Sequence, residues 1–252
     1  MRERYSAERR FADFYKHYVG DFRLDIPLYL DLAAKYSGPV LEVGCRTGRV
    51  AAHLAAAGHQ VLGIDRSRPM LEVGLEHLRA WEDRVRIQFV DLRAAPLPER
   101  FQVALVTLHT FNLLIDIEEQ RLFLRHLRRS MQSPGVLAID FFCPLSLAHP
   151  DSTEEWRQIE RSCDGHSLVV RDRREMLTPL LERRTQVFRV DQGPEAERVS
   201  HRRFVTPGLA AQLLEEAGYE GILCITGYDI SSARPATEEA GMSSPFVLLA
   251  ET

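Results

Sequence analysis

The stretch that most constrains the fold is PVLEVGCRTGRVAAHLAAAGHQVLGID, residues 39–65. It reads as a buried strand, a turn that contains Gly44 and Gly48, a helix that Gly58 can end, and a second strand that finishes at Asp65. Two strands joined through a helix in this way run parallel. The stretch therefore predicts an α/β fold.

Further β-rich runs alternate with helical patterns as far as about residue 142. This alternation is typical of a doubly wound, mostly parallel sheet with helices on both faces. Helix start signals support it, because Ser67, Asp116 and Thr206 each precede a helical pattern. The predicted strands are VLEV, QVLGID, RVRIQFVD, FQVALVTL and GVLAIDFF.

After residue 144 the pattern changes to alternating strands, in SLVVRDRREMLTPLLERRTQVFRVD and ERVSHRRFV. We interpret residues 144–205 as an antiparallel β insertion over the active-site cleft. The helix TPGLAAQLLEEAGYE and the strands GILCITGYD and PFVLLAE then complete the sheet. We expect a single domain over residues 1–252, with a helical cap in residues 1–38 and a seven-stranded sheet whose last strand is antiparallel.

The composition narrows the classes of function. A hydrophobic content of 45% in 252 residues is enough for a full core, and a net charge of -4 disfavours nucleic acid as a partner. No apolar run approaches the roughly 18 residues of a membrane span, and no signal peptide is recognisable, so we expect no membrane partner and a cytoplasmic location. The four cysteines form no C-x-x-C pair, so we expect neither a disulfide framework nor a metal site.

The glycine turn predicts an anion-binding corner, because the first N–H groups of the helix that follows lack partners and the helix dipole favours negative charge. The dinucleotide pattern G-x-G-x-x-G would need glycines at positions 44, 46 and 49, where the chain has Gly44, Arg46 and Arg49. Asp65 is placed to bind a ribose diol. These features favour a nucleoside whose other end is a carboxylate.

The segment EVGCRTG, residues 42–48, resembles motif I, acid-x-Gly-x-Gly-x-Gly, of class I S-adenosylmethionine-dependent methyltransferases. FVDLR, TLHTFNLL and AIDFFCP resemble the segments at the third, fourth and fifth strands of that family, so the resemblance covers most of the chain. Flanking segments such as HRRFVTPGLAAQLLEEAGYE are similar to a branch that methylates small molecules, often amines on amino acids or sugars.

The resemblance implies S-adenosylmethionine as the cofactor, with Asp65 on the ribose, Asp91 on the adenine amino group and Leu92 against the adenine ring. Arg46 departs from the family pattern, because it replaces the middle glycine; it either crowds the methionine moiety or pairs with its carboxylate. The implied cofactor-binding residues are Tyr18, Glu42, Gly44, Cys45, Arg46, Gly48, Asp65, Arg66, Met70, Asp91, Leu92 and Leu108.

Methyl transfer from a sulfonium is an in-line displacement, so positioning matters more than acid–base chemistry. His109, just after the fourth strand, is the best-placed base for a protonated amine, and the alternative is an ordinary loop histidine. Asn112 either orients a polar group of the substrate or stabilises a turn. Candidates for substrate choice lie in the insertion, at Trp156, His166, His201 and Arg202.

We therefore predict an enzyme that methylates a small molecule, with N-methylation favoured over O-methylation. Two alternatives stay open: a methyltransferase that acts on a protein or RNA, and a protein that binds S-adenosylmethionine without turnover. The sequence leaves the acceptor and the oligomeric state undetermined.

Overall fold

The structure is a computed structural model that describes residues 2–142, 155–163, 165–236 and 246–252. The start of the predicted insertion, residues 144–154, lies outside the described residues. Within them, no helix is long and apolar enough to cross a membrane.

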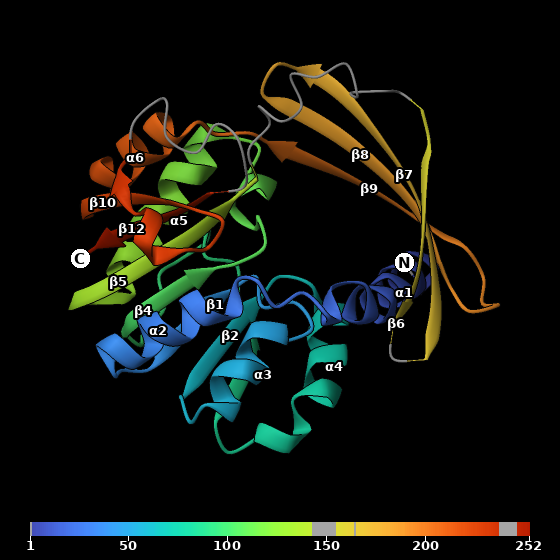
Figure 1. The fold of residues 1–252 in the computed structure, drawn as a ribbon, viewed down its shortest axis with the longest axis horizontal. Helices are drawn as coiled ribbons and strands as arrows, with labels where there is room; N and C mark the ends of the chain where they lie inside the picture. Colours follow the sequence, from blue (N-terminus) through green and yellow to red (C-terminus); the bar gives the residue numbers. More distant parts are fainter. Residues whose placement is uncertain (1, 143–154, 164, 237–245) are drawn as a thin grey trace.

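A mostly parallel sheet forms the centre of the fold (Figure 1). Its strands are β1 (Val40–Val43), β2 (Val61–Asp65), β3 (Val85–Phe89), β4 (Phe101–Val106), β5 (Met131–Phe141), β10 (Glu220–Thr226), β11 (Arg234–Pro235) and β12 (Phe246–Glu251), in the order β11-β10-β12-β5-β4-β1-β2-β3. β12 runs antiparallel to both of its neighbours, as predicted. All seven predicted strands are present, and the two-residue β11 adds an eighth at the edge.

Helices cover both faces of this sheet, which confirms the doubly wound class (Figure 1). The apolar sides of the helices form two separate cores with the strands, because buried strands present side chains to both faces. One face carries α2 (Ile26–Tyr36), α3 (Arg49–Ala56) and α4 (Arg68–His77), and the other carries α5 (Ile117–Arg129) and α6 (Pro207–Glu216). Short 3₁₀ helices follow at η1 (Arg79–Trp81), η2 (Phe111–Leu113) and η4 (Ile230–Ser232).

The predicted helix starts are confirmed in position, and two of the three N-cap side chains make the expected capping hydrogen bond. Asp116 accepts hydrogen bonds from the backbone N–H groups of Glu118 and Glu119, and Thr206 accepts one from Leu209. Ser67 precedes α4, but its side chain makes no capping hydrogen bond.

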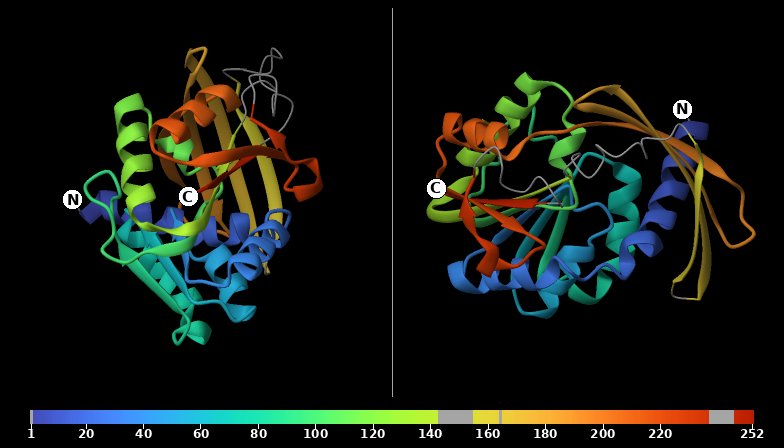
Figure 2. Two further views of the ribbon diagram at one scale, coloured as in Figure 1. Left: turned by 90° about the vertical axis from the view of Figure 1, so that its left-hand side faces the viewer. Right: turned by 45° about the horizontal axis from the view of Figure 1, so that its top comes forward.

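A second, antiparallel sheet follows β5, as predicted. It consists of β6 (Arg157–Cys163), β7 (His166–Thr178), β8 (Leu181–Val190) and β9 (Ala196–Arg203), paired in chain order. One end of this sheet packs on α1 (Arg2–Gly20), where the ring centroids of Phe11 and Phe14 lie 5.3 and 4.8 Å from that of Phe188. Figure 2 shows this sheet standing beside the central sheet, with α1 against it. The second sheet therefore lies beside the carboxyl ends of the parallel strands, where such folds bind ligands.

Candidate active site

The turn after β1 is built for close approach. Gly44 and Gly48 have φ angles of 73° and 78°, which favour glycine. A Cβ on Gly44 would lie 2.4 Å from Oγ1 of Thr110, in the turn after β4. A Cβ on Gly48, the residue before α3, would lie 2.5 Å from Cδ1 of Leu78. Gly44 therefore lets the turns after β1 and β4 meet at one edge of the sheet, and Gly48 lets the start of α3 approach Leu78 at the end of α4.

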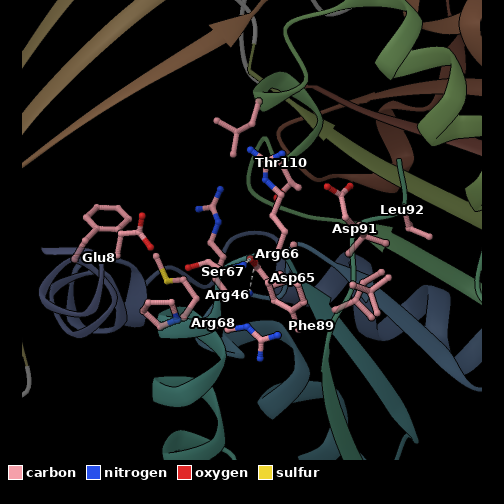
Figure 3. A pocket seen from close by; sticks show the side chains of 18 of the residues that line it. Glu8, Arg46, Asp65, Arg66, Ser67, Arg68, Phe89, Asp91, Leu92 and Thr110 are labelled. Carbon is pink, nitrogen blue, oxygen red and sulfur yellow. Dashed lines mark hydrogen bonds between the residues drawn. The ribbon is translucent and has the colours of Figure 1, made fainter. Parts of the chain in front are cut away.

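Asp65 connects this turn to the next helix. Its Oδ2 accepts a 3.0 Å hydrogen bond from the backbone N–H of Arg46, and its Oδ1 accepts one of 2.8 Å from Ser67 (Figure 3). Burial raises the pKa of Asp65, and the nearby Arg46 and these N–H groups act against that shift. The carboxylate therefore lies fixed at the end of β2, where a ribose diol could donate hydrogen bonds to it.

A cavity of about 750 Å³ extends along this edge of the sheet. Figure 3 shows Asp65 between Glu8 of α1 on one side and Asp91, after β3, on the other. Seven of the twelve predicted cofactor residues line the cavity: Gly44, Arg46, Asp65, Arg66, Met70, Asp91 and Leu92.

The far end of the cavity combines an acid with apolar and aromatic walls. Nε of Arg93 donates to Asp91 Oδ1 at 2.9 Å, and this side chain holds the pKa of Asp91 below its usual range. Leu92 is buried beside it. Phe89 is 48% exposed, and the guanidinium of Arg68 lies 4.4 Å from its ring centroid. An adenine ring would find an apolar surface and a charged acceptor here.

Phe89 and Arg68 were not predicted as site residues. Phe89 is the last residue of β3, at the carboxyl edge of the sheet, and this position could have identified it as a site residue. Nothing in the sequence around Arg68 indicates such a role.

Arg46 lies between this cavity and a smaller one lined by Glu42, Cys45 and Leu108, and it lines both. Its guanidinium donates a hydrogen bond to the hydroxyl of Tyr15 and another, of 3.4 Å, to the carbonyl of Leu108. The same group lies 4.8 Å from the centroid of the Tyr15 ring. Arg46 therefore occupies the path from the ribose end toward the turn after β4.

Glu42 lies beneath the glycine turn and outside the large cavity. It is 2% exposed, its Oε2 accepts a 2.9 Å hydrogen bond from the N–H of Ala51, and the hydroxyl of Thr107 donates to its Oε1 at 3.3 Å. Burial raises its pKa to about 8. In this structure Glu42 joins β1, α3 and β4 rather than lining the cavity floor.

The turn after β4 has an unusual backbone. Leu108 and His109 both have positive φ angles, 44° and 61°, and such conformations in non-glycine residues cost roughly 1–3 kcal/mol each. Asp140, near the end of β5, supports them: its Oδ2 accepts hydrogen bonds of 3.1 Å from the N–H of Leu108 and 2.8 Å from the hydroxyl of Tyr228. Strain maintained in this way is common at functional sites.

The side chain of His109 faces that same carboxyl group. Its Nε2 lies 3.5 Å from Oδ1 of Asp140, and neither atom has a hydrogen-bond partner among the described residues. Burial lowers the pKa of His109 to about 3, and Arg202, Arg46 and Arg184 shift it in the same direction. Burial raises the pKa of Asp140 to about 7. The pair can therefore hold a proton near neutral pH, with the carboxyl group as its more basic member.

Several predicted residues lie away from the cavities. Asn112 is fully buried; its Nδ2 donates to the carbonyl of Arg203 at 2.8 Å, and its Oδ1 accepts from the N–H of Phe142 at 2.9 Å. Tyr18 stacks on Phe14, with centroids 5.1 Å apart. Asn112 therefore links β9 of the second sheet to the end of β5 in the central sheet. A contact of Asn112 with substrate, or of Tyr18 with the cofactor, stays a prediction, and the positions of these two side chains do not support it.

The predicted candidates of the insertion lie in different places. Trp156 is 46% exposed, His166 pairs with Asp191 at 2.8 Å, and His201 is exposed. Only Arg202 among the four influences the pKa of His109. The insertion therefore brings one of these side chains near the turn after β4.

The residues present fit S-adenosylmethionine. The cavity offers an apolar end with Asp91 for adenine, Asp65 for the ribose, and Arg46 as a cation for the methionine carboxylate. The donor set suits a nucleoside joined to an amino acid. Among the described residues, no cluster of three histidine, cysteine or acidic side chains could hold a metal ion.

Together the fold and the site define a class I methyltransferase domain. Residues 40–135 match the protein family described as a methyltransferase domain. The match begins at β1 and ends within β5. It contains the turn after β1, with Gly44 and Gly48, and the turn after β2, which begins at Asp65. The predicted class, an S-adenosylmethionine-dependent methyltransferase, is confirmed at the level of this domain and its fold.

The chain is similar to several proteins named as methyltransferases. It is 34% identical over 101 residues to the cypemycin N-terminal methyltransferase of a Streptomyces species, and the matched part is 40% of each chain. A solved S-adenosylmethionine-dependent methyltransferase from Clostridium acetobutylicum has a TM-score of 0.74 at 14% identity, over 96% of this chain and 97% of its own. The sugar N-methyltransferase KedS8 from a Streptoalloteichus species has a TM-score of 0.71 at 17% identity, over 96% of this chain and 92% of its own. At these identities, the two structures show a shared fold.

Proposed function

We propose that this protein transfers a methyl group from S-adenosylmethionine to a nitrogen atom of a small-molecule acceptor. The observation that carries the proposal is the continuity of the site: the cavity runs from Asp91 past Asp65 to Arg46, whose guanidinium contacts the carbonyl of Leu108 beside His109. A cofactor placed along this line would present its reactive end to the space under the second sheet. Residues 1–252 would act as one domain, with residues 1–38 as a cap and residues 144–205 as a wall for the acceptor.

The cofactor-binding roles follow the chemistry of each side chain. Asp65 would accept hydrogen bonds from the ribose hydroxyls, and Phe89 and Leu92 would contact the adenine ring. Arg46 would pair with the methionine carboxylate, exchanging its contact with the Tyr15 hydroxyl for a charge-assisted hydrogen bond.

The reaction needs a neutral nucleophile close to the turn after β4. S-adenosylmethionine would supply an electrophilic methyl group that the acceptor lone pair displaces in line from sulfur. The new N–CH₃ bond leaves a positive charge on nitrogen, and the nitrogen loses one N–H proton. His109 and the ionised Asp140 would take up that proton together, because their atoms lie 3.5 Å apart and Asp140 titrates near neutral pH.

The preference for nitrogen over oxygen is supported by the names of similar proteins, one an N-terminal methyltransferase and one a sugar N-methyltransferase. The positive charge around His109 favours a deprotonated nucleophile of either kind. A cytoplasmic location and the absence of nucleic acid and membrane partners remain part of the proposal.

Isothermal titration calorimetry with S-adenosylmethionine, followed by methyl release on a panel of amines, amino sugars, short peptides and phenols, tests the proposal. Mass spectrometry of the products identifies the methylated atom. We expect cofactor binding and turnover on at least one small amine. Binding without turnover on any class would favour the non-catalytic alternative, and turnover confined to proteins or RNA would favour the macromolecular one.

A further inference from the structure

One face of the second sheet is rich in arginine. It is the face on which the buried residues of β8, such as Glu182 and Gln186, lie. In the register of β7, β8 and β9, Arg174 lies opposite Arg184, and Gln186 lies opposite Arg198. Glu182 lies opposite Arg202 on the same face. Glu182 and Gln186 are buried and Arg198 lines the large cavity, so this face is directed toward the space between the two sheets.

Two of these arginines are already neutralised. Asp172 accepts a hydrogen bond of 2.5 Å from Nε of Arg184 and one of 3.1 Å from Nε of Arg174. A single carboxylate therefore holds both guanidinium groups. Their positions are fixed by the sheet and by this shared contact.

Arg198 and Arg202 lack such a partner. Neither guanidinium has a hydrogen bond or an ion pair with any described residue; they lie over aromatic rings instead, Arg198 4.2 Å from the centroid of Phe11 and Arg202 5.6 Å from that of Phe142. The carboxylate of Glu182 is buried without a hydrogen-bond partner among the described residues, although it lies opposite Arg202. Arg202 is thus a partly buried cation whose donors are available.

Both side chains carry their charge at neutral pH. Burial lowers the pKa of Arg202 to about 9 and that of Arg198 to about 10. The charge of Glu182 offsets part of this shift in Arg202, but Glu182 makes no hydrogen bond among the described residues. A bound anion that accepts hydrogen bonds would therefore stabilise either buried guanidinium.

The two arginines face different parts of the site. Arg198 lines the cavity that holds Asp65 and Arg46, and is therefore near the expected cofactor carboxylate. Arg202 lies over the ring of Phe142. The centroid of this ring lies 5.3 Å from that of His109 and 5.8 Å from the guanidinium carbon of Arg174. Arg202 belongs to the acceptor side.

We propose that the methyl acceptor carries a carboxylate or phosphate group, and that Arg202 binds this group on the inner face of the second sheet. The inference rests on the proposed function, since it concerns the acceptor of that reaction. Arg202 offers a planar fork of N–H donors that matches both anions. An acceptor held there by its acidic group would place the rest of its atoms beside Phe142 and His109, where the nucleophilic nitrogen is needed.

The direct test is calorimetric titration of inorganic phosphate and of acetate into protein saturated with S-adenosylhomocysteine. We expect at least one anion to bind, and we expect Arg202→Gln to weaken the affinity for that anion by at least tenfold. Tighter binding of phosphate would indicate a phosphate group on the acceptor, and tighter binding of acetate would indicate a carboxylate. Arg183→Gln is the matched control, because Arg183 pairs with Glu175 on the opposite face of the same strand, β8. The proposal is wrong if neither anion binds the wild type, or if both variants bind it equally.

The cofactor titration is performed first and separates this inference from the proposed function. Failure of S-adenosylhomocysteine to bind would reject the proposed function, and the anion titrations would then be run on the cofactor-free protein. Arg202→Gln should bind S-adenosylhomocysteine like the wild type, whereas Arg198→Gln should not. Arg202→Lys keeps the positive charge, so it should recover part of the anion affinity that Arg202→Gln loses. If the lysine variant is folded and recovers no affinity, a site based on charge is contradicted.

Discussion

Arg49 and Asp25 form a buried, two-pronged ion pair, with N–O distances of 2.8 and 2.5 Å and side chains 7% and 0% exposed. Arg49 begins α3, directly after the glycine turn, and Asp25 precedes α2. Arg49 also donates a 2.8 Å hydrogen bond to the carbonyl of Phe22. The pair thus fastens the connection between α1 and α2 to the turn that is expected to hold the cofactor.

Asp25→Asn should destabilise the protein by about 3–5 kcal/mol, because it leaves the Arg49 guanidinium buried without a counter-charge. Urea unfolding measures the change. Asp13→Asn is the control, since Asp13 makes an exposed ion pair with Arg9 and should cost less than about 1 kcal/mol. Equal effects of the two substitutions would show that the buried pair contributes nothing special.

Asp65→Ala should weaken S-adenosylmethionine binding by about tenfold to 150-fold, since hydrogen bonds to a charged group are worth roughly 1.5–3 kcal/mol. Titration calorimetry provides the affinity, and circular dichroism checks the fold because Asp65 also holds two backbone N–H groups. Asp83→Ala, at an exposed acid, should leave the affinity unchanged. An unaltered affinity for the Asp65 variant would remove this residue from the site.

Arg46→Gly separates two accounts of the substituted motif glycine. The backbone at this position has a φ of 52°, so glycine relieves strain of roughly 1 kcal/mol and should raise the melting temperature. If Arg46 pairs with the cofactor carboxylate, the same change should weaken S-adenosylmethionine by about fivefold or more. Arg46→Lys should lie between the two. Tighter binding by the glycine variant would mean that the arginine crowds the site.

The pair of His109 and Asp140 should give turnover that rises with pH through about 7, because Asp140 must ionise before the pair can accept a proton. His109→Ala should lower turnover by roughly 100-fold to 10,000-fold with little effect on cofactor affinity. Asp140→Asn should lower turnover and abolish the pH dependence. A profile that is flat from pH 6 to 8 in the wild type, or an alanine variant within a few-fold of it, would leave His109 as an ordinary loop histidine.

Glu42 should make the protein less stable as the pH rises. Its pKa is about 8 in the folded protein and near the ordinary 4.5 when unfolded, so the folded state holds the proton more tightly. The resulting stability is complete below about pH 4.5 and is lost as the pH rises through about 8. Glu42→Gln should therefore show a flatter dependence of unfolding free energy between pH 6 and 9. Parallel curves for variant and wild type would contradict the shifted pKa.

The parts of the fold set by local pattern were predictable. VLEV matches β1 residue for residue, and Asp65 ends β2 as expected, because periodicity and turn glycines act within a few residues. The insertion was recognised from the change to strand periodicity. The extra strand β11 was missed, because two residues carry no periodic signal.

The parts of the site set by tertiary contacts were not predictable. Asp140 and Tyr228 lie 88 residues apart, and only the folded sheet brings them together behind His109. Asn112 lies three residues after His109 and so close to the expected active site in sequence. The sequence does not show toward which side of the turn its amide group points. Arg198 gave no signal, because an alternating strand does not reveal which of its faces meets the cavity.

In the part of the chain that the structure describes, the two sheets share no strand: β6 to β9 hydrogen-bond in order with one another, while the central sheet is completed by β10 to β12. Substitutions on the inner face of β7, β8 and β9 can therefore change the shape and charge of the acceptor space without moving the strands that position Gly44 and Asp65. On the proposed function, such a separation would let the acceptor site change while the site for the methyl donor stays the same. Grafting residues 155–205 between relatives would be a practical route to new acceptors.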